Sequence, residues 1–114
     1  MSKYSDALVK AMTMLAEDPS VLFLGQCIRF PGHIMFGTLL HIPDGKKLEV
    51  PVAEEMQMGM SIGLALKGFL PVSIYPRMDF LLLAINQLVN HLDKAEAMSQ
   101  GQYRPKVLIR TMVG

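Results

Sequence analysis

The stretch that decides the fold is LEVPVAEEMQMGMSIGLALKG, residues Leu48–Gly68. Its first five residues alternate apolar with other side chains, which predicts an extended segment that leads into a turn. Two adjacent acids, Glu54 and Glu55, then open a run of small and apolar residues that closes at Gly68. This run predicts a buried helix with carboxylates in its first turn.

The two acids have two compatible interpretations. Unpaired N–H groups and the helix dipole favour negative charge at any helix start, so the pair could simply stabilise the first turn. Alternatively, one acid faces a pocket and acts there as a hydrogen-bond or proton partner. Neighbouring helical residues point about 100° apart, so only one of the two can address a given ligand atom.

Composition limits the number of domains and the kinds of partner that the chain can have. A length of 114 residues allows one domain at most, and 51% hydrophobic residues supply ample core. Only 18% of the residues are charged and ten are Met, which predicts a face that contacts another surface. The net charge of +1 indicates neither nucleic acid nor an anionic membrane as a partner. The polar N-terminus lacks an apolar signal core and Cys27 stands alone, so we expect a cytoplasmic protein.

Helices and strands are expected to alternate along the chain. The predicted elements are a helix capped by Ser5, a strand at 21–24, a long loop at 26–47, the 48–68 unit, a strand at 70–75, a helix from Phe80 to about Ala97 capped by Asp79, and a strand at 107–109. Such alternation implies an α/β fold, with a parallel sheet flanked by helices.

Local motifs identify little chemistry. The three His residues and Cys27 have no metal-ligand spacing, and no glycine-rich phosphate loop occurs. Cys27 follows a strand end without a nearby base, so a structural role is favoured. Phe80 would ordinarily be a core residue. Pattern alone therefore predicts an α/β domain with an acid at a helix start.

Several blocks nevertheless resemble a known family. VLFLG, PVAEEMQMGMSIGLALKGFLPV, MDFLLLAINQLVNHLDKAEAMSQGQ and VLIRTMVG occur in the order and spacing of the thiamine-diphosphate-dependent enzymes. More narrowly, they resemble the pyrimidine-binding domain of the beta subunit of 2-oxo acid dehydrogenase decarboxylase components, such as pyruvate dehydrogenase. The resemblance runs from Ser5 to Gly114 and is weakest in the loop at 26–47. It implies that residues 1–114 form a single, incomplete pyrimidine-binding domain.

The resemblance also implies site residues. The family's cofactor glutamate falls on Glu54, within Pro51-Val52-Ala53-Glu54, and its pyrimidine-stacking aromatic falls on Phe80. In the family, this carboxyl group hydrogen-bonds the aminopyrimidine ring and favours the imino tautomer, which activates the thiazolium carbon. The cofactor supplies the carbanion chemistry, and the protein supplies placement.

Some family features are missing from the sequence. Gln26 and Cys27 follow the first strand where the family often has an acid, and the family's Asp-Gln pair is Asn86-Gln87. No Gly-Asp-Gly motif for the diphosphate and its magnesium ion occurs, so these would be held by an alpha-type subunit or another domain. The resemblance therefore implies a hetero- or homo-oligomer acting on a 2-oxo acid. A split transketolase-type ketol transferase and a non-catalytic assembly module are the alternatives.

Overall fold

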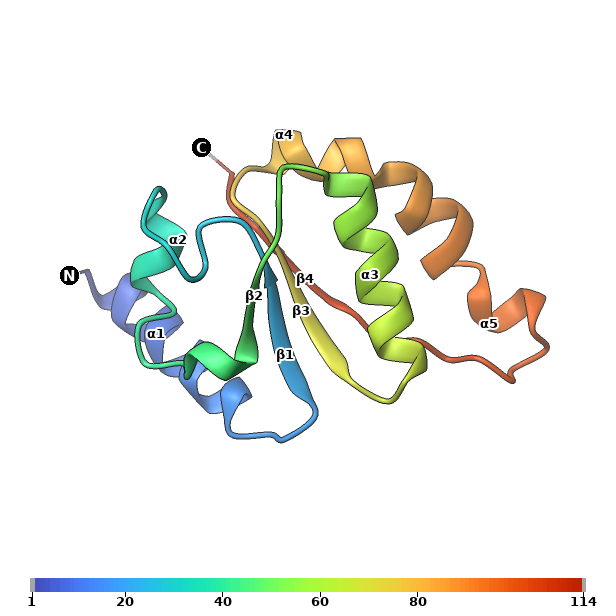
Figure 1. Ribbon diagram of the computed structural model, residues 1–114, viewed down its shortest axis with the longest axis horizontal. Helices are drawn as coiled ribbons and strands as arrows, with labels where there is room; N and C mark the ends of the chain where they lie inside the picture. The colour runs from blue at the N-terminus through green and yellow to red at the C-terminus, as the bar shows by residue number, and fades with distance from the viewer. Residues whose placement is uncertain (1, 114) are drawn as a thin grey trace.

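The computed structural model describes residues 2–113 and has a parallel sheet at its centre (Figure 1). The sheet has the order β2-β1-β3-β4, and each neighbouring pair is parallel. Its strands are β1 (Val21–Gly25), β2 (Lys47–Glu49), β3 (Leu70–Tyr75) and β4 (Leu108–Thr111). The predicted α/β class with a helix-flanked parallel sheet is confirmed.

Helices cover both faces of this sheet (Figure 1). One face carries α1 (Lys3–Ala16) and α2 (Ile34–Gly37), and the other carries α3 (Glu54–Leu66), α4 (Met78–Leu81) and α5 (Ala95–Met98). The strand order explains this division. The chain runs from β1 to β2 in one direction across the sheet, and from β2 through β3 to β4 in the opposite direction. Right-handed crossovers then put the connecting helices on opposite faces.

The two faces have separate cores. On the α1 side, alternate strand residues such as Phe23, Val72 and Ile74 pack with Met12 and Met35. On the α3 side, Met58, Tyr75, Leu81 and Ala84 form a smaller cluster. β1 is paired on both sides and almost wholly buried, as its continuous apolar run predicts.

Several predicted boundaries were wrong. Ser2, not Ser5, caps α1, because the Ser2 side chain accepts a hydrogen bond from the Ser5 N–H at 3.2 Å. The helix predicted to begin after an Asp79 cap begins instead at Met78, so Asp79 lies within its first turn. The last strand is shifted toward the C-terminus and covers Leu108–Thr111.

The predicted long helix at 80–97 is also not uniform. After α4 it tightens into a 3-10 turn at Leu82–Ala84 and then widens into a π-helical segment at Gln87–Leu92, before α5. The Asp93 N–H bonds to the Leu88 carbonyl at 3.0 Å, five residues back, as π geometry requires. Apolar periodicity marks such a segment as helical but does not reveal the extra residue in one turn.

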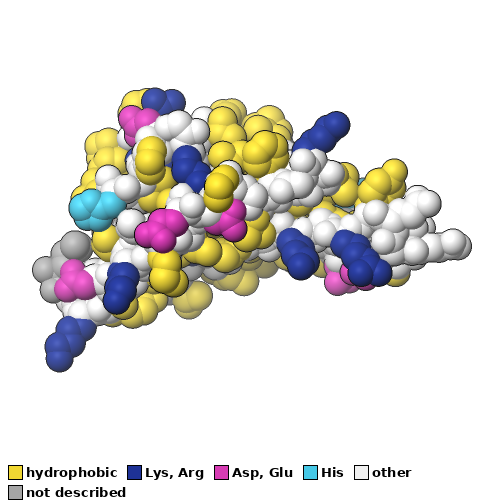
Figure 2. Space-filling view, turned by 90° about the horizontal axis from the view of Figure 1, so that it is seen from below, with side chains coloured by type: hydrophobic (Ala, Val, Ile, Leu, Met, Phe, Trp, Pro, Cys, Tyr) yellow, Lys and Arg dark blue, Asp and Glu magenta, His cyan; other side chains and the backbone are white. Residues whose placement is uncertain are grey.

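Apolar side chains also reach the surface. Figure 2 shows hydrophobic side chains among the charged ones over one face of the molecule. Exposed large apolar residues on and beside α3 and α4 include Val52, Met56, Met60, Leu82 and Leu83. The low charge and high Met content of the sequence predicted such a surface.

Candidate functional site

The candidate site lies at the carboxyl edge of the sheet, where strand ends meet helix starts. α3 begins shortly after β2 and α4 begins shortly after β3, and both starts lie together at the top of Figure 1. The strand order switches between β1 and β3, because the chain passes from β1 to β2 on one side and from β3 to β4 on the other. In open parallel sheets, ligands bind outside the carboxyl ends of the strands at such a switch.

Glu54 is the first residue of α3 and is only 8% exposed. The Tyr75 hydroxyl, at the end of β3, donates to the Glu54 backbone carbonyl at 3.3 Å and fixes the helix start to the sheet. Burial raises the pKa of Tyr75 and the nearby Glu54 carboxylate adds to the rise, so this hydroxyl stays a donor at neutral pH. Within residues 2–113, no hydrogen bond to the Glu54 carboxylate is formed, which leaves it available to a ligand.

Glu55 lies in a different environment from its neighbour. Its side chain is exposed, and its Oε1 accepts a hydrogen bond from Asn86 Nδ2 at 2.8 Å. The two acids therefore point to different surroundings, as the 100° rotation between helical neighbours requires. Of these two acids, only Glu54 is a buried residue whose carboxylate has no hydrogen-bond partner among residues 2–113. This favours Glu54 over Glu55 as the ligand-facing acid.

Phe80 lies in α4 and is half-buried. α4 follows β3 directly, and the 3-10 turn after it packs against α3. The structure thus brings Glu54 and Phe80 to the same edge of the sheet, from two different helices. Their roles toward a cofactor stay predictions.

Gln57, which the sequence pattern did not single out, is 1% exposed and lies one turn after Glu54. Its Nε2 donates to the Ile74 carbonyl at 2.9 Å and to Ser73 Oγ at 3.1 Å, and it lies 3.4 Å from the Leu24 carbonyl. One amide therefore bridges the carboxyl ends of β1 and β3 and anchors the first turn of α3. The signal was an uncharged polar residue three positions after Glu54, on the same face of an otherwise apolar helix.

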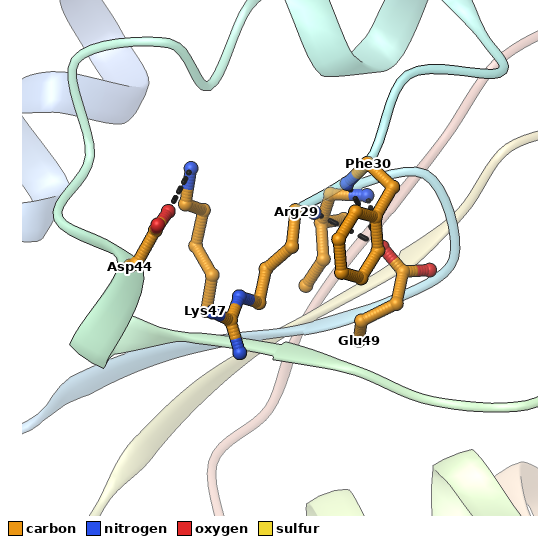
Figure 3. A network of polar contacts seen from close by, with 6 residues as sticks. Arg29, Phe30, Asp44, Lys47 and Glu49 are labelled. Atoms are coloured by element: carbon orange, nitrogen blue, oxygen red, sulfur yellow. Dashed lines mark hydrogen bonds and ion pairs between the residues drawn. The ribbon is translucent and has the colours of Figure 1, made fainter.

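Glu49 organises the loop beside the site (Figure 3). Its carboxylate accepts hydrogen bonds from four successive backbone N–H groups, those of Cys27 (2.8 Å), Ile28 (3.0 Å), Arg29 (3.0 Å) and Phe30 (3.4 Å). Such a concave row of N–H groups is an anion-binding arrangement, and here the protein's own carboxylate occupies it. Figure 3 also shows Lys47 pairing with Asp44, at 3.3 Å.

Cys27 has a structural environment. Its backbone is left-handed, with φ of 57°, and forms part of the row of N–H groups that Glu49 holds. Burial raises the pKa of the Cys27 thiol, and the Glu49 charge raises it further. A protonated thiol is a poor nucleophile, so the structure supports the structural interpretation of this residue.

No cluster of three or more His, Cys, Asp or Glu within residues 2–113 could hold a metal ion. Two cavities, of about 540 and 640 Å³, lie beside α1 and along β4, and neither Glu54 nor Phe80 lines them. None of the helices in the described part of the chain has the length and apolarity that a membrane span requires.

Comparison with known proteins gives consistent relatives. No protein-family model matches the chain. Pyruvate dehydrogenase E1 component subunit beta-4, chloroplastic, of Oryza sativa subsp. japonica is 34% identical over 108 residues, which cover 92% of this chain and 26% of that protein. The subunit beta of Chaetosphaeridium globosum is also 34% identical over 108 residues, covering 92% of this chain and 32% of that protein.

A third relative extends the same pattern. Subunit beta-3, chloroplastic, of Arabidopsis thaliana is 34% identical over 97 residues, which cover 82% of this chain and 24% of that protein. The chain thus spans about a quarter to a third of the length of the curated relatives it matches. The rice and Arabidopsis proteins are named as chloroplastic, so they give no support to the predicted cytoplasmic location, which stays a prediction.

Proposed function

This chain is a homologue of the beta subunits of the pyruvate dehydrogenase E1 component, and on that premise we propose that it supplies the aminopyrimidine side of a thiamine-diphosphate site. The complete enzyme would be a 2-oxo acid decarboxylase or dehydrogenase. Residues 1–114 would contribute a pyrimidine-binding domain, and the site would form at an interface with an alpha-type subunit.

The observation that carries the proposal is the Glu54 carboxylate. It lies at a helix start, in a buried residue, with no hydrogen-bond partner among residues 2–113. The carboxylate oxygens of Glu54 are not among the buried unpaired side-chain atoms of residues 2–113, so they can be reached from outside and a ligand nitrogen could bond them there. Phe80, on the neighbouring helix, offers an aromatic ring to the same edge of the sheet, where a heteroaromatic ring could stack.

Each residue then has a defined task. When bound, thiamine diphosphate supplies carbanion chemistry. Glu54 would hold a proton against the pyrimidine nitrogen, and Phe80 would orient the ring. Tyr75 and Gln57 would keep the Glu54 turn fixed on the sheet. The sequence contains no Gly-Asp-Gly motif, so the diphosphate and magnesium would be held by the alpha-type subunit.

Calorimetric titration with thiamine diphosphate and magnesium tests the proposal. The titration uses the complex of this chain with the subunit that co-purifies with it. Glu54→Gln removes the carboxyl group's ability to hold a proton, and we expect the affinity to fall about tenfold or more, the usual scale for a charge-assisted hydrogen bond. Glu96→Gln, at an exposed acid paired with Arg104, is the matched control and leaves the affinity unchanged.

The outcomes separate the alternatives. Equal affinity in Glu54→Gln and Glu96→Gln would overturn the role of Glu54. No binding by the complex at all would favour an assembly module, to which the exposed apolar side chains on α3 and α4 could contribute contacts. A complex that binds the cofactor and turns over ketose phosphates, but not 2-oxo acids, would indicate the transketolase-type alternative.

A further inference from the structure

We propose that Asn86 is a positioning residue, which holds the first turn of α3 against the helical segment after α4 and so fixes where the Glu54 carboxyl group lies relative to Phe80. The proposal rests on the proposed function and deepens it. The contact that carries it is the 2.8 Å hydrogen bond from Asn86 Nδ2 to Glu55 Oε1, which joins residues 31 positions apart.

The first turn of α3 is held from two sides. Toward the sheet, the Tyr75 hydroxyl bonds the Glu54 carbonyl and Gln57 bonds the carbonyl of Ile74. Toward the other helix, Asn86 bonds the Glu55 carboxylate. Adjacent residues of one turn are thus fixed to two different elements. Glu54 lies beside these anchored residues in the chain, so we expect loss of the Asn86 anchor to loosen the turn that carries the Glu54 carboxyl group.

The anchor on the second helix is part of a longer row of polar contacts. Lys94 Nζ donates to Asn90 Oδ1 at 3.3 Å, and Asn90 Nδ2 donates to Asn86 Oδ1 at 3.0 Å. Asn86 then donates to Glu55, so two amides connect a cation to a carboxylate. The row sets which way the Asn86 amide points, because its oxygen accepts from Asn90 while its nitrogen donates to Glu55.

The identity of residue 86 explains why this arrangement works. An asparagine can donate to Glu55 and accept from Asn90 at the same time. An ionised aspartate accepts only, and at this distance it would place a second negative charge against the Glu55 carboxylate. The asparagine at 86 and the glutamate at 55 are therefore complementary.

Cofactor affinity measured in the complex with the co-purifying subunit tests the proposal. Asn86→Ala and Asn86→Asp are expected to weaken thiamine-diphosphate affinity by about threefold to tenfold, the scale of one charge-assisted bond at an exposed position. Glu55→Gln still presents an acceptor oxygen to Asn86 and should retain most of the affinity, whereas Glu55→Ala should not. Gln102→Ala, at an exposed glutamine away from the site, is the neutral control.

A second measurement does not depend on the cofactor. Hydrogen exchange of the Gln57 amide, which donates to the Ala53 carbonyl at 2.9 Å and closes the first turn of α3, should quicken in Asn86→Ala, while exchange in β1 and β3 stays slow. Unchanged affinity and unchanged exchange in Asn86→Ala would overturn the positioning role. If Glu54→Gln weakens binding and Asn86→Ala does not, only the positioning role fails. If the complex binds no cofactor, the proposed function fails, and the exchange rates still show whether Asn86 holds the turn.

Discussion

Replacing Glu49 tests the claim that one carboxylate organises the loop beside the site. Of its four N–H donors, those of Cys27 and Ile28 are partly buried and those of Arg29 and Phe30 are exposed. Water can replace Glu49 at the exposed pair but less readily at the buried pair. Two bonds to a charged acceptor, at about 1.5 kcal/mol each, predict a loss of about 3 kcal/mol in Glu49→Ala.

A graded variant makes this prediction sharper. Oε1 accepts from three of the donors and Oε2 accepts from Cys27 alone. Glu49→Gln keeps an oxygen at the Oε1 position, loses the charge and turns an NH₂ group toward the Cys27 N–H. We therefore expect about half the loss, about 1.5 kcal/mol.

Urea unfolding followed by circular dichroism measures both changes as free energies of unfolding. Glu96→Ala is the control, because an exposed acid with one ion pair should matter by about 0.5 kcal/mol or less. A loss in Glu49→Ala no larger than in the control would refute the reasoning. It would mean that water serves the loop N–H groups as well as the carboxylate does.

Three further predictions concern the sheet and a turn. Gln57→Leu leaves the Ile74 carbonyl and Ser73 Oγ without their buried partner, so we expect the free energy of unfolding to fall by about 2 kcal/mol. Gln102→Leu is the exposed control, and an equal effect of both variants would contradict the role of the Gln57 amide between the strands. Gly25→Ala would place a Cβ 2.3 Å from the Ile74 carbonyl oxygen at a φ of +153°, so this variant should fail to fold. Gly63→Ala has open space around its Cβ, and its free energy of unfolding should rise by up to about 1 kcal/mol. Thermal melts compare the two variants, and a stable Gly25→Ala would refute the close approach. The Ser20 N–H and hydroxyl lower the pKa of Asp18 from its ordinary value of 3.8, so the ionised acid stabilises the folded state above that pH. This stabilisation is lost as the pH falls through the lowered pKa. The stability of Asp18→Asn, measured by unfolding between pH 5 and 2, should therefore depend less on pH, and identical curves for the two proteins would show that the turn contributes nothing.

How much of the fold could be predicted from the sequence depended on how far apart in the chain the interacting residues lie. Apolar runs and helix-start acids are local signals, so β1, α3 and β3 were predicted almost to the residue. The helix after β3 was misjudged because a π-helical turn and a tight 3-10 turn keep a helical apolar pattern. Its hydrogen-bond spacing depends on packing against α3, which no local pattern shows.

The residues of the candidate site also differ in whether a local sequence signal identifies them. Glu54 could be singled out because a motif and a helix start coincide there. Gln57, Glu49 and Asn86 could not, because their partners lie between 16 and 33 residues away and meet them only after the sheet has formed. A polar residue in an apolar helix signals that a partner exists without saying which one.

The π-helical segment at Gln87–Leu92 has a consequence for changes in chain length. The segment carries one more residue in its turn than an α-helix would, and the Asp93 N–H already reaches back to Leu88. A single-residue deletion here could be absorbed by re-pairing four residues back, without breaking the helix. The residues after it would keep the face that they now present, because the wide turn already accommodates the extra residue; the same deletion in a regular α-helical turn would rotate everything after it by about 100°. The π-helical segment is therefore the place in this helix where the chain could lose one residue without changing the face that the following helix presents.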